Sequence, residues 1–246
     1  MMIGGIDLAW GERNRDGVCF IRAGRSGARV LRFSYPRGDN ELLREIQNAM
    51  EDDGRTFLTI DAPIVCPNRT GTRPVDRLTH KLFHREHAAC HPANSTKCPR
   101  PPRILCKLKR LGFRAGWEFN RHPRMVAEVY PHPAMVRLFR LERIVKYKKG
   151  RVVERRSEFS RLQHLMGQLL EREFGALELD AEARRLLSLP WTKALEDRLD
   201  ALFCALLGLW HWTYRGRRSE VIGDVRRGFI LLPEDLRRST TATITP

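Results

Sequence analysis

Residues 1–10 read Met-Met-Ile-Gly-Gly-Ile-Asp-Leu-Ala-Trp, an apolar run with a single carboxylate, Asp7, near its end. Such a run predicts a buried β-strand over 2–10. A carboxylate inside a buried strand costs several kcal/mol unless it is paired or holds a metal ion. Asp7 is therefore expected to belong to a site, and the rest of the chain can be searched for its partners.

Further acidic residues interrupt or end other hydrophobic segments. They are Asp61 after the run 56–60, Glu128 within 125–130, and Asp197 and Asp200 within 195–212. Repeated placement of acids in apolar elements predicts one acidic, metal-binding centre. Carboxylate oxygens are hard ligands, which favour Mg²⁺ or Mn²⁺ over zinc.

Each of these acids also has a plainer interpretation. Asp61 precedes Ala-Pro and suits a turn. Glu128 can be the structural ion-pair partner of a nearby arginine. Asp197 can be a favourable charge near the start of its helix. Asp197 and Asp200 are spaced i, i+3 and share one helix face, so the sequence leaves open which of them faces the centre.

The order of predicted elements indicates an α/β fold. Three strands separated by short turns predict an antiparallel meander at 2–10, 17–23 and 28–34. The predicted elements that follow are a helix at 39–52 capped by Asp39 or Asn40, strands at 55–61 and 124–130, helices at 133–140, 154–174, 180–188 and 193–214, and a strand at 228–233. We expect a mixed sheet flanked by helices, with sites at the strand ends.

Residues 66–118 differ from the rest in composition, with 12 Lys and Arg against three acidic residues. This segment is expected to be a basic insertion with helices at 75–90 and 103–111 around an irregular stretch at 91–102. Its side chains expected to contact nucleic acid are Arg73, Arg77, Lys81, His84, Arg85, His87, Lys107, Lys109 and Arg110. His80, His84, His87 and His91 are spaced for one helical stripe.

Two other interpretations of the insertion stay open. Zinc would use Cys90 and Cys98, with Cys66 or Cys106 and His87 or His91, although the Cys-x-x-Cys pair typical of zinc sites is missing. The alternative is a solvated basic helix that packs its histidines on the domain.

Charge and hydropathy limit which binding partners and which cellular compartment are expected. Lys plus Arg exceed Asp plus Glu by 45 − 29 = +16, which favours polyanions such as nucleic acid over a merely soluble surface. No apolar stretch is long enough to span a bilayer, and no secretory signal is visible, so a cytoplasmic protein without membrane contact is expected.

Five short motifs together carry a family resemblance. In order they are GIDLAWG (5–11), TIDAPI (59–64), EVYPHPA (128–134), RLDALFCALLG (198–208) and GFILLP (228–233). This set resembles the domain of unknown function 429 family, described as predicted RNase H-like nucleases, within the RNase H-like superfamily. The resemblance implies a five-stranded mixed sheet of three antiparallel and then parallel strands. It also implies a site of divalent-metal ligands, with Asp7, Asp61 and Asp200 carried over, Asp197 as the competing helix ligand, and Glu128 as a ligand or a substrate-loop residue.

The expected function is a divalent-metal-dependent nuclease that hydrolyses phosphodiester bonds of DNA or RNA, with Asp7, Asp61, Asp200 and Glu128 as catalytic residues. The alternative is a non-catalytic nucleic-acid-binding module of the same fold. An actin-like small-molecule phosphotransferase is a third possibility. The absence of a second glycine-rich phosphate loop from the sequence argues against it. Residues 1–236 are expected to form one domain, followed by a flexible tail at 237–246.

Overall fold

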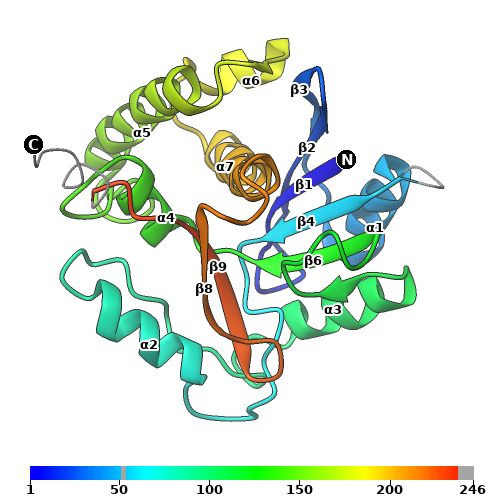
Figure 1. The fold of residues 1–246 in the computed structure, drawn as a ribbon. Helices are drawn as coiled ribbons and strands as arrows, with labels where there is room; N and C mark the ends of the chain where they lie inside the picture. The colour runs from blue at the N-terminus through cyan, green and yellow to red at the C-terminus, as the bar shows by residue number, and fades with distance from the viewer. Residues whose placement is uncertain (51–53, 238–246) are drawn as a thin grey trace, which may run out of the picture.

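A seven-stranded mixed sheet forms the centre of the protein in the computed structural model, which describes residues 1–50 and 54–237 (Figure 1). In spatial order its strands are β5 (Arg114–Ala115), β6 (Arg124–Glu128), β4 (Thr56–Ile60), β1 (Met2–Asp7), β2 (Gly17–Gly24), β3 (Gly27–Ser34) and β7 (Leu177–Glu178). β1, β2 and β3 are antiparallel, whereas β4 is parallel to β1 and β6 is parallel to β4. The predicted meander followed by parallel strands is confirmed.

The predicted count of five strands is too low. β5 and β7 extend the two edges of the sheet by pairing with β6 and β3. Each contains two residues, which is too short to leave a periodic hydrophobic pattern in the sequence.

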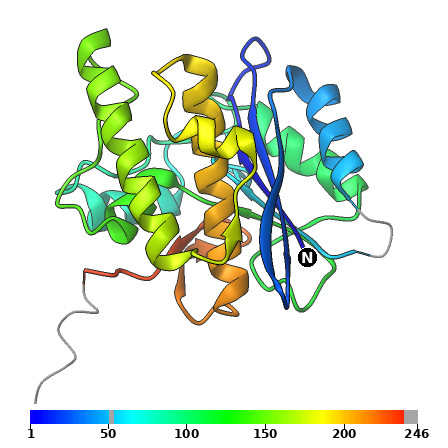
Figure 2. The ribbon, with the colours of Figure 1, turned by 90° about the horizontal axis from the view of Figure 1, so that it is seen from above.

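Alternating side chains divide the protein into two cores, one on each face of the sheet. Ile3 packs in the core that contains α7 (Lys193–Thr213), whereas Met2 and Ile6 pack in the core that contains α1 (Gly38–Ala49) and α3 (Arg100–Arg110). Figure 2 shows α7 on one side of the strands and α1 and α3 on the other. Successive side chains of a strand point to opposite faces, so Asp7 leaves β1 on the α7 face.

The helices on the α7 side follow the predicted hydrophobic periodicity. α4 (Pro131–Leu138), α5 (Val152–Glu173) and α6 (Ala181–Leu186) start and end within a few residues of their predicted bounds. The apolar face of α5 contributes Phe159 and Met166 to the same core as α7. The four predicted helices of this half of the chain are therefore confirmed.

The start of α1 differs from the prediction. Arg37 is the cap residue and no side chain caps the helix, whereas Asp39 lies inside the first turn. The Asp39 carboxylate instead accepts a hydrogen bond from the guanidinium of Arg100, at 2.9 Å. Asp39, which the local sequence predicted as a helix cap, therefore binds Arg100, a residue distant in sequence.

A two-stranded sheet lies beyond the central one. β8 (Ser219–Asp224) pairs antiparallel with β9 (Gly228–Pro233), and α2 (Pro74–Phe83) packs against both (Figure 1). The predicted strand at 228–233 is confirmed, whereas β8 was not predicted. β8 is mostly half-buried or exposed and carries Ser219, Glu220 and Asp224, so it has no buried hydrophobic run to reveal it.

Segment 66–118 is partly built into the central domain. Ile104, Leu105 and Leu108 of α3 lie in the second core, and β5 joins the sheet. α3 begins at Arg100, three residues before the predicted start, because prolines fit the first turn of a helix. Within the described residues, no helix is apolar over a stretch that could cross a bilayer. The tail predicted at 237–246 lies, from residue 238 on, outside the described residues.

Candidate functional site: an acidic cluster at the ends of two strands

Parallel pairing of β1 and β4 brings the first two predicted acids to one edge of the sheet. β1 ends at Asp7 rather than at residue 10, and Asp61 directly follows β4. The backbone N–H of Asp61 donates to the carbonyl of Ile6 at 2.9 Å. The α7-facing positions of β4 are Phe57 and Thr59, so Asp61 continues on the same face as Asp7.

Glycines without side chains let α7 approach these strands closely. A Cβ on Gly5 would lie 2.1 Å from the backbone nitrogen of Ala205, and one on Gly17 would lie 2.0 Å from the carbonyl oxygen of Asp197. Neither position accepts any larger residue without moving the helix. Gly5 and Gly17 thus let α7, between Asp197 and Ala205, lie directly against the strands that end near Asp7.

Asp200 is the helix carboxylate that joins Asp7 and Asp61. It is completely buried, and one of its oxygens accepts a 2.7 Å hydrogen bond from the Tyr147 hydroxyl. Its other oxygen lies 2.8 Å from the ammonium nitrogen of Lys148. The sequence treated 146–150 only as a basic turn, so Tyr147 and Lys148 are site residues that it missed.

Asp197 is held elsewhere, although it lies one helical turn from Asp200. Its carboxylate accepts a 2.6 Å hydrogen bond from the Tyr35 hydroxyl and forms a 2.7 Å ion pair with Lys193. Both oxygens are therefore in use. The structure favours Asp200 over Asp197 as the helix member of the centre, and Asp197 as the competing metal ligand stays a prediction.

Burial and mutual repulsion raise the pKa values of the acidic cluster, by which we mean Asp7, Asp61 and Asp200. Burial raises the pKa of Asp7 well above its ordinary value, and the charges of Asp200 and Asp61 raise it further against the opposing effect of Lys148. Burial likewise raises the pKa of Asp61 to about 7. The pKa of Asp200 is also raised by burial, while Lys148 and Tyr147 lower it. The cluster has three carboxylates and one ammonium, so its ionised form has an excess of negative charge.

The chemistry of this cluster fits a hard divalent cation. Oxygen donors with surplus negative charge are the ligands that Mg²⁺ and Mn²⁺ prefer. In the described part of the chain, however, no group of three or more Asp, Glu, His or Cys side chains is already spaced to hold an ion. A cation would have to draw the three carboxylates together and compete with Lys148 for Asp200.

Glu128 lines the same small cavity as Asp61 but is held by an arginine rather than joined to the acidic cluster. It lies in register with Ile60, whose side chain packs in the second core, so Glu128 leaves β6 on the face opposite to Asp61. Both its oxygens accept hydrogen bonds from the guanidinium of Arg73, at 2.7 and 2.8 Å. The same guanidinium also binds Asp76. The geometry therefore supports the ion-pair interpretation of Glu128, and its catalytic role stays a prediction.

Arg73 also departs from its predicted role. Only 2% of its surface is exposed, and its donors are taken by Glu128, Asp76 and the carbonyl of Val65. It cannot reach a phosphate without breaking this network. Its physical role is to tie the start of α2 to the end of β6.

The remaining predicted nucleic-acid contacts fall into two groups rather than one arm. Arg77, Lys81, His84, Arg85 and His87 are exposed on or just after α2. Lys109 and Arg110 are exposed on α3, on a different side of the molecule (Figure 1), and the partly exposed Lys107 pairs with Asp39. The predicted histidine stripe is wrong, because α2 ends at Phe83 and His87 has a positive φ of 59°.

The cysteines considered for zinc are scattered. Cys66 and Cys98 share a small cluster with Ala93, Cys90 belongs to the large core, and Cys106 is exposed on α3. Burial raises the pKa of the Cys66 thiol to about 12. The structure thus brings two of the four candidate cysteines together.

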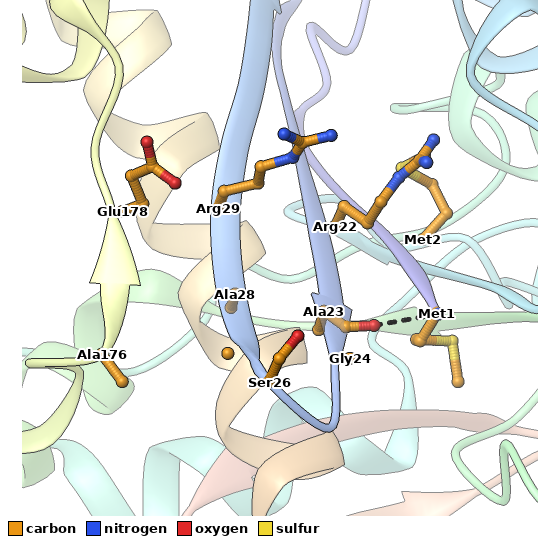
Figure 3. Close-up of a pocket in the computed structure, with 11 residues that line it drawn as sticks. Met1, Met2, Arg22, Ala23, Gly24, Ser26, Ala28, Arg29, Ala176 and Glu178 are labelled. Atoms are coloured by element: carbon orange, nitrogen blue, oxygen red, sulfur yellow. Dashed lines mark hydrogen bonds between the residues drawn. The ribbon is translucent and has the colours of Figure 1, made fainter.

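Two cavities differ in their relation to the acidic cluster. The larger, of about 470 Å³, lies at the amino end of β1, where Arg22, Arg29 and Glu178 line it (Figure 3). This is the opposite end of the strand from Asp7. The smaller, of about 60 Å³, is lined by Asp61 together with Trp10, His91 and Tyr130. Of these two cavities, the smaller one is therefore next to the acidic cluster.

Comparison with known proteins places the chain in a family. The model of the family described as "Protein of unknown function (DUF429)" matches residues 5–227. The chain belongs to this family, and the match covers the first four of the five motifs that carry the resemblance, while GFILLP (228–233) follows directly after it. No curated protein and no solved structure matches it.

Proposed function

We propose that the protein is a divalent-metal-dependent nuclease with an RNase H-like fold. The observation that carries the proposal is the acidic cluster. Asp7, Asp61 and Asp200 come from three different elements and meet on one face at the end of the sheet. Three carboxylates near a single lysine destabilise the fold when they are ionised, because they repel one another. The same arrangement favours the binding of a cation.

The order of the strands supports the fold assignment. β3, β2, β1, β4 and β6 lie side by side, with the first three antiparallel and the last two parallel to β1. This is the arrangement that the family resemblance implies. The acidic cluster lies at the carboxyl ends of β1 and β4, where sheets of this class place their sites.

The residues divide naturally between metal and substrate. Asp7, Asp61 and Asp200 would hold Mg²⁺ or Mn²⁺, which when bound supplies an activated water and positive charge for the leaving oxygen. Tyr147 fixes the orientation of the Asp200 carboxylate through its hydrogen bond. Lys148, whose ammonium nitrogen lies 2.8 Å from Asp200 and whose side chain is half-buried, would place a positive charge beside an approaching phosphate.

The overall charge supports a polyanionic substrate. The net charge is +16. The side chains of Arg77, Lys81 and Arg85, on or just after α2, and of Lys109 and Arg110, on α3, are exposed. Lys and Arg on a surface neutralise phosphates and displace condensed counterions.

Cleavage of labelled single-stranded, duplex and branched DNA and RNA with Mn²⁺ tests the proposal. We expect Asp7→Asn and Asp200→Asn to reduce cleavage by at least about 100-fold, as loss of a main catalytic charge does, while the circular-dichroism spectrum stays unchanged. Asp197→Asn is the matched control one helical turn away and should retain cleavage. Equal activity of wild type and the Asp7→Asn, Asp200→Asn double variant would overturn the proposal.

A non-catalytic nucleic-acid-binding module is the second candidate. It is favoured by the 2.8 Å contact between Lys148 and Asp200, which neutralises one carboxylate without a metal ion. This candidate predicts binding whose affinity falls steeply with salt concentration and no turnover with any divalent metal. Detection of Mn²⁺-dependent cleavage that Asp7→Asn abolishes would reject it.

A further inference from the structure

Trp10 is the exposed tryptophan of this chain. It keeps 40% of its surface in contact with solvent. The other four are buried or half-buried, namely Trp117, Trp191, Trp210 and Trp212. One exposed aromatic ring is common on proteins, so the role of Trp10 has to be inferred from the residues around it.

The backbone on both sides of Trp10 is clamped by a buried arginine. Arg100 donates to the carbonyl of Ala9 at 2.6 Å and to that of Gly11 at 3.4 Å. Arg100 is itself 1% exposed and held by Asp16 at 2.6 and 2.7 Å, and the N–H of Ala9 donates to the same carboxylate. The indole therefore projects into solvent from a fixed base, which lowers the entropy cost of binding a ligand against it.

Trp10 borders the small cavity that reaches the acidic cluster. Asp61, His91 and Tyr130 line the same cavity. Its volume of about 60 Å³ corresponds to roughly two water molecules. A nucleobase does not fit inside, so a ring at this position has to lie at the rim, against the indole.

We infer that Trp10 stacks an unpaired nucleobase next to the phosphodiester that approaches Asp61, which makes single-stranded nucleic acid the substrate class. This inference rests on the proposed function and deepens it. Aromatic side chains that bind single strands do so through the flat face of a base, and every base has one. Bases in a duplex are stacked on both faces and offer none to Trp10.

Binding of an oligothymidylate of about 10 nucleotides, within the range of known single-strand sites, tests the inference. The titration is done in EDTA at low salt, so that cleavage does not enter. Trp10→Leu keeps bulk and hydrophobicity but removes the π-face, and should weaken binding by about 5- to 150-fold. Trp10→Phe should retain most of the affinity, and the exposed Val153→Ala, on α5, should bind as wild type.

A second readout locates the base directly. The same strand carrying one 5-iodouracil should photocrosslink to residue 10 in wild type and in Trp10→Phe, and not in Trp10→Leu. A matched duplex should bind all three proteins equally.

Each result bears on one proposal or the other. Unchanged single-strand affinity of Trp10→Leu, a crosslink mapped away from residue 10, or a wild type that binds no single strand would overturn the stacking inference. Binding through Trp10 without any Mn²⁺-dependent cleavage would overturn the nuclease proposal, and with it the role of the strand as a substrate, but would leave the stacking contact at Trp10 standing.

Discussion

Two kinds of buried charge occur in this protein, and they differ in how their charges are balanced. Around Arg73 and around Arg100, each guanidinium binds carboxylates through several hydrogen bonds at once. In the acidic cluster, carboxylates outnumber their cation. Among the described residues, no lysine or arginine forms a close ion pair with Asp7 or Asp61, although Lys148 is near enough to influence both.

The paired clusters join segments that are far apart in sequence. Arg100 connects α3 to Asp16 before β2 and to Asp39 in α1. Arg73 connects the start of α2 to Glu128 at the end of β6. A buried pair contributes little net stability over an apolar core, but removal of one partner leaves an uncompensated charge. These clusters therefore specify how the loops attach to the sheet.

The acidic cluster has the opposite character. Its carboxylates have raised pKa values, because burial and repulsion disfavour their ionised forms. Such a cluster weakens the fold unless a cation binds, and costs of this kind are typical of functional sites. The comparison predicts that substitution should harm stability in one region and function in the other.

The largest effect is expected from breaking a paired cluster. Arg100→Ala leaves Asp16 and Asp39 buried without their guanidinium, so the free energy of unfolding in urea should fall by about 3–5 kcal/mol. Arg103→Ala, at a side chain that is 43% exposed, is the matched control and should cost about 1 kcal/mol or less. If both variants lose the same amount, the distinction between buried and surface pairs fails here.

A smaller effect is expected from moving α7 away from the acidic cluster. The Cβ of Gly5→Ala would collide with the backbone of Ala205, and overpacking of this kind costs about 1–3 kcal/mol. The same displacement should weaken Mn²⁺ binding measured by calorimetry. Gly24→Ala, where no atom lies within 4 Å of the added Cβ, should change neither quantity. Wild-type Mn²⁺ affinity in Gly5→Ala would show that α7 does not complete the site.

The protonation of Asp61 should control the affinity for Mn²⁺. Its pKa is about 7, above the ordinary value of 3.8, so the proton stays on below pH 7 and has to leave before a metal binds. Affinity should therefore fall by at least about tenfold for each pH unit below 7, because the pKa values of Asp7 and Asp200 are raised as well. Calorimetry from pH 5 to about 8 measures this, and a flat profile would contradict the assignment.

The same raised pKa sets the sign of a stability effect without metal. A carboxyl that is protonated more readily in the folded state contributes stability that is fully present below about pH 4. That contribution is lost as pH rises through about 7. Urea unfolding in EDTA should show this decline in wild type and less of it in Asp61→Asn.

The smallest effect is expected at the solvent edge of a paired cluster. Lys107, with 30% of its side chain exposed, adds a third cation to Asp39, and Lys107→Ala should cost about 0–1 kcal/mol. Hydrogen bonds from Lys107, Arg100 and Arg103 lower the pKa of Asp39 to about 2 against the effect of burial. The stability from these pairs is thus fully present above about pH 4 and lost as pH falls through 2, so the difference between the variant and wild type should vanish in acid.

Periodicity and local chemistry predicted most of the elements and pointed to Asp7 and Asp61, and the family motif added Asp200, the third member of the acidic cluster. Asp7 and Asp61 could be found because each ends a run of buried strand residues, where a charge is costly and therefore informative. The long helices were predictable because 21 or 22 residues with a regular apolar stripe leave a strong pattern. The two-residue edge strands and β8 left none.

Only the tertiary structure decided how the charges are partnered. Asp197 and Asp200 look alike in sequence, and they differ because Tyr35 and Lys193 reach one while Tyr147 and Lys148 reach the other. Arg73 and Arg100 look like surface cations of a basic segment, yet carboxylates from distant strands and loops draw them inside. The physical reason is that a charge is stabilised by its nearest neighbours in space, and those neighbours come from segments that local sequence patterns do not connect.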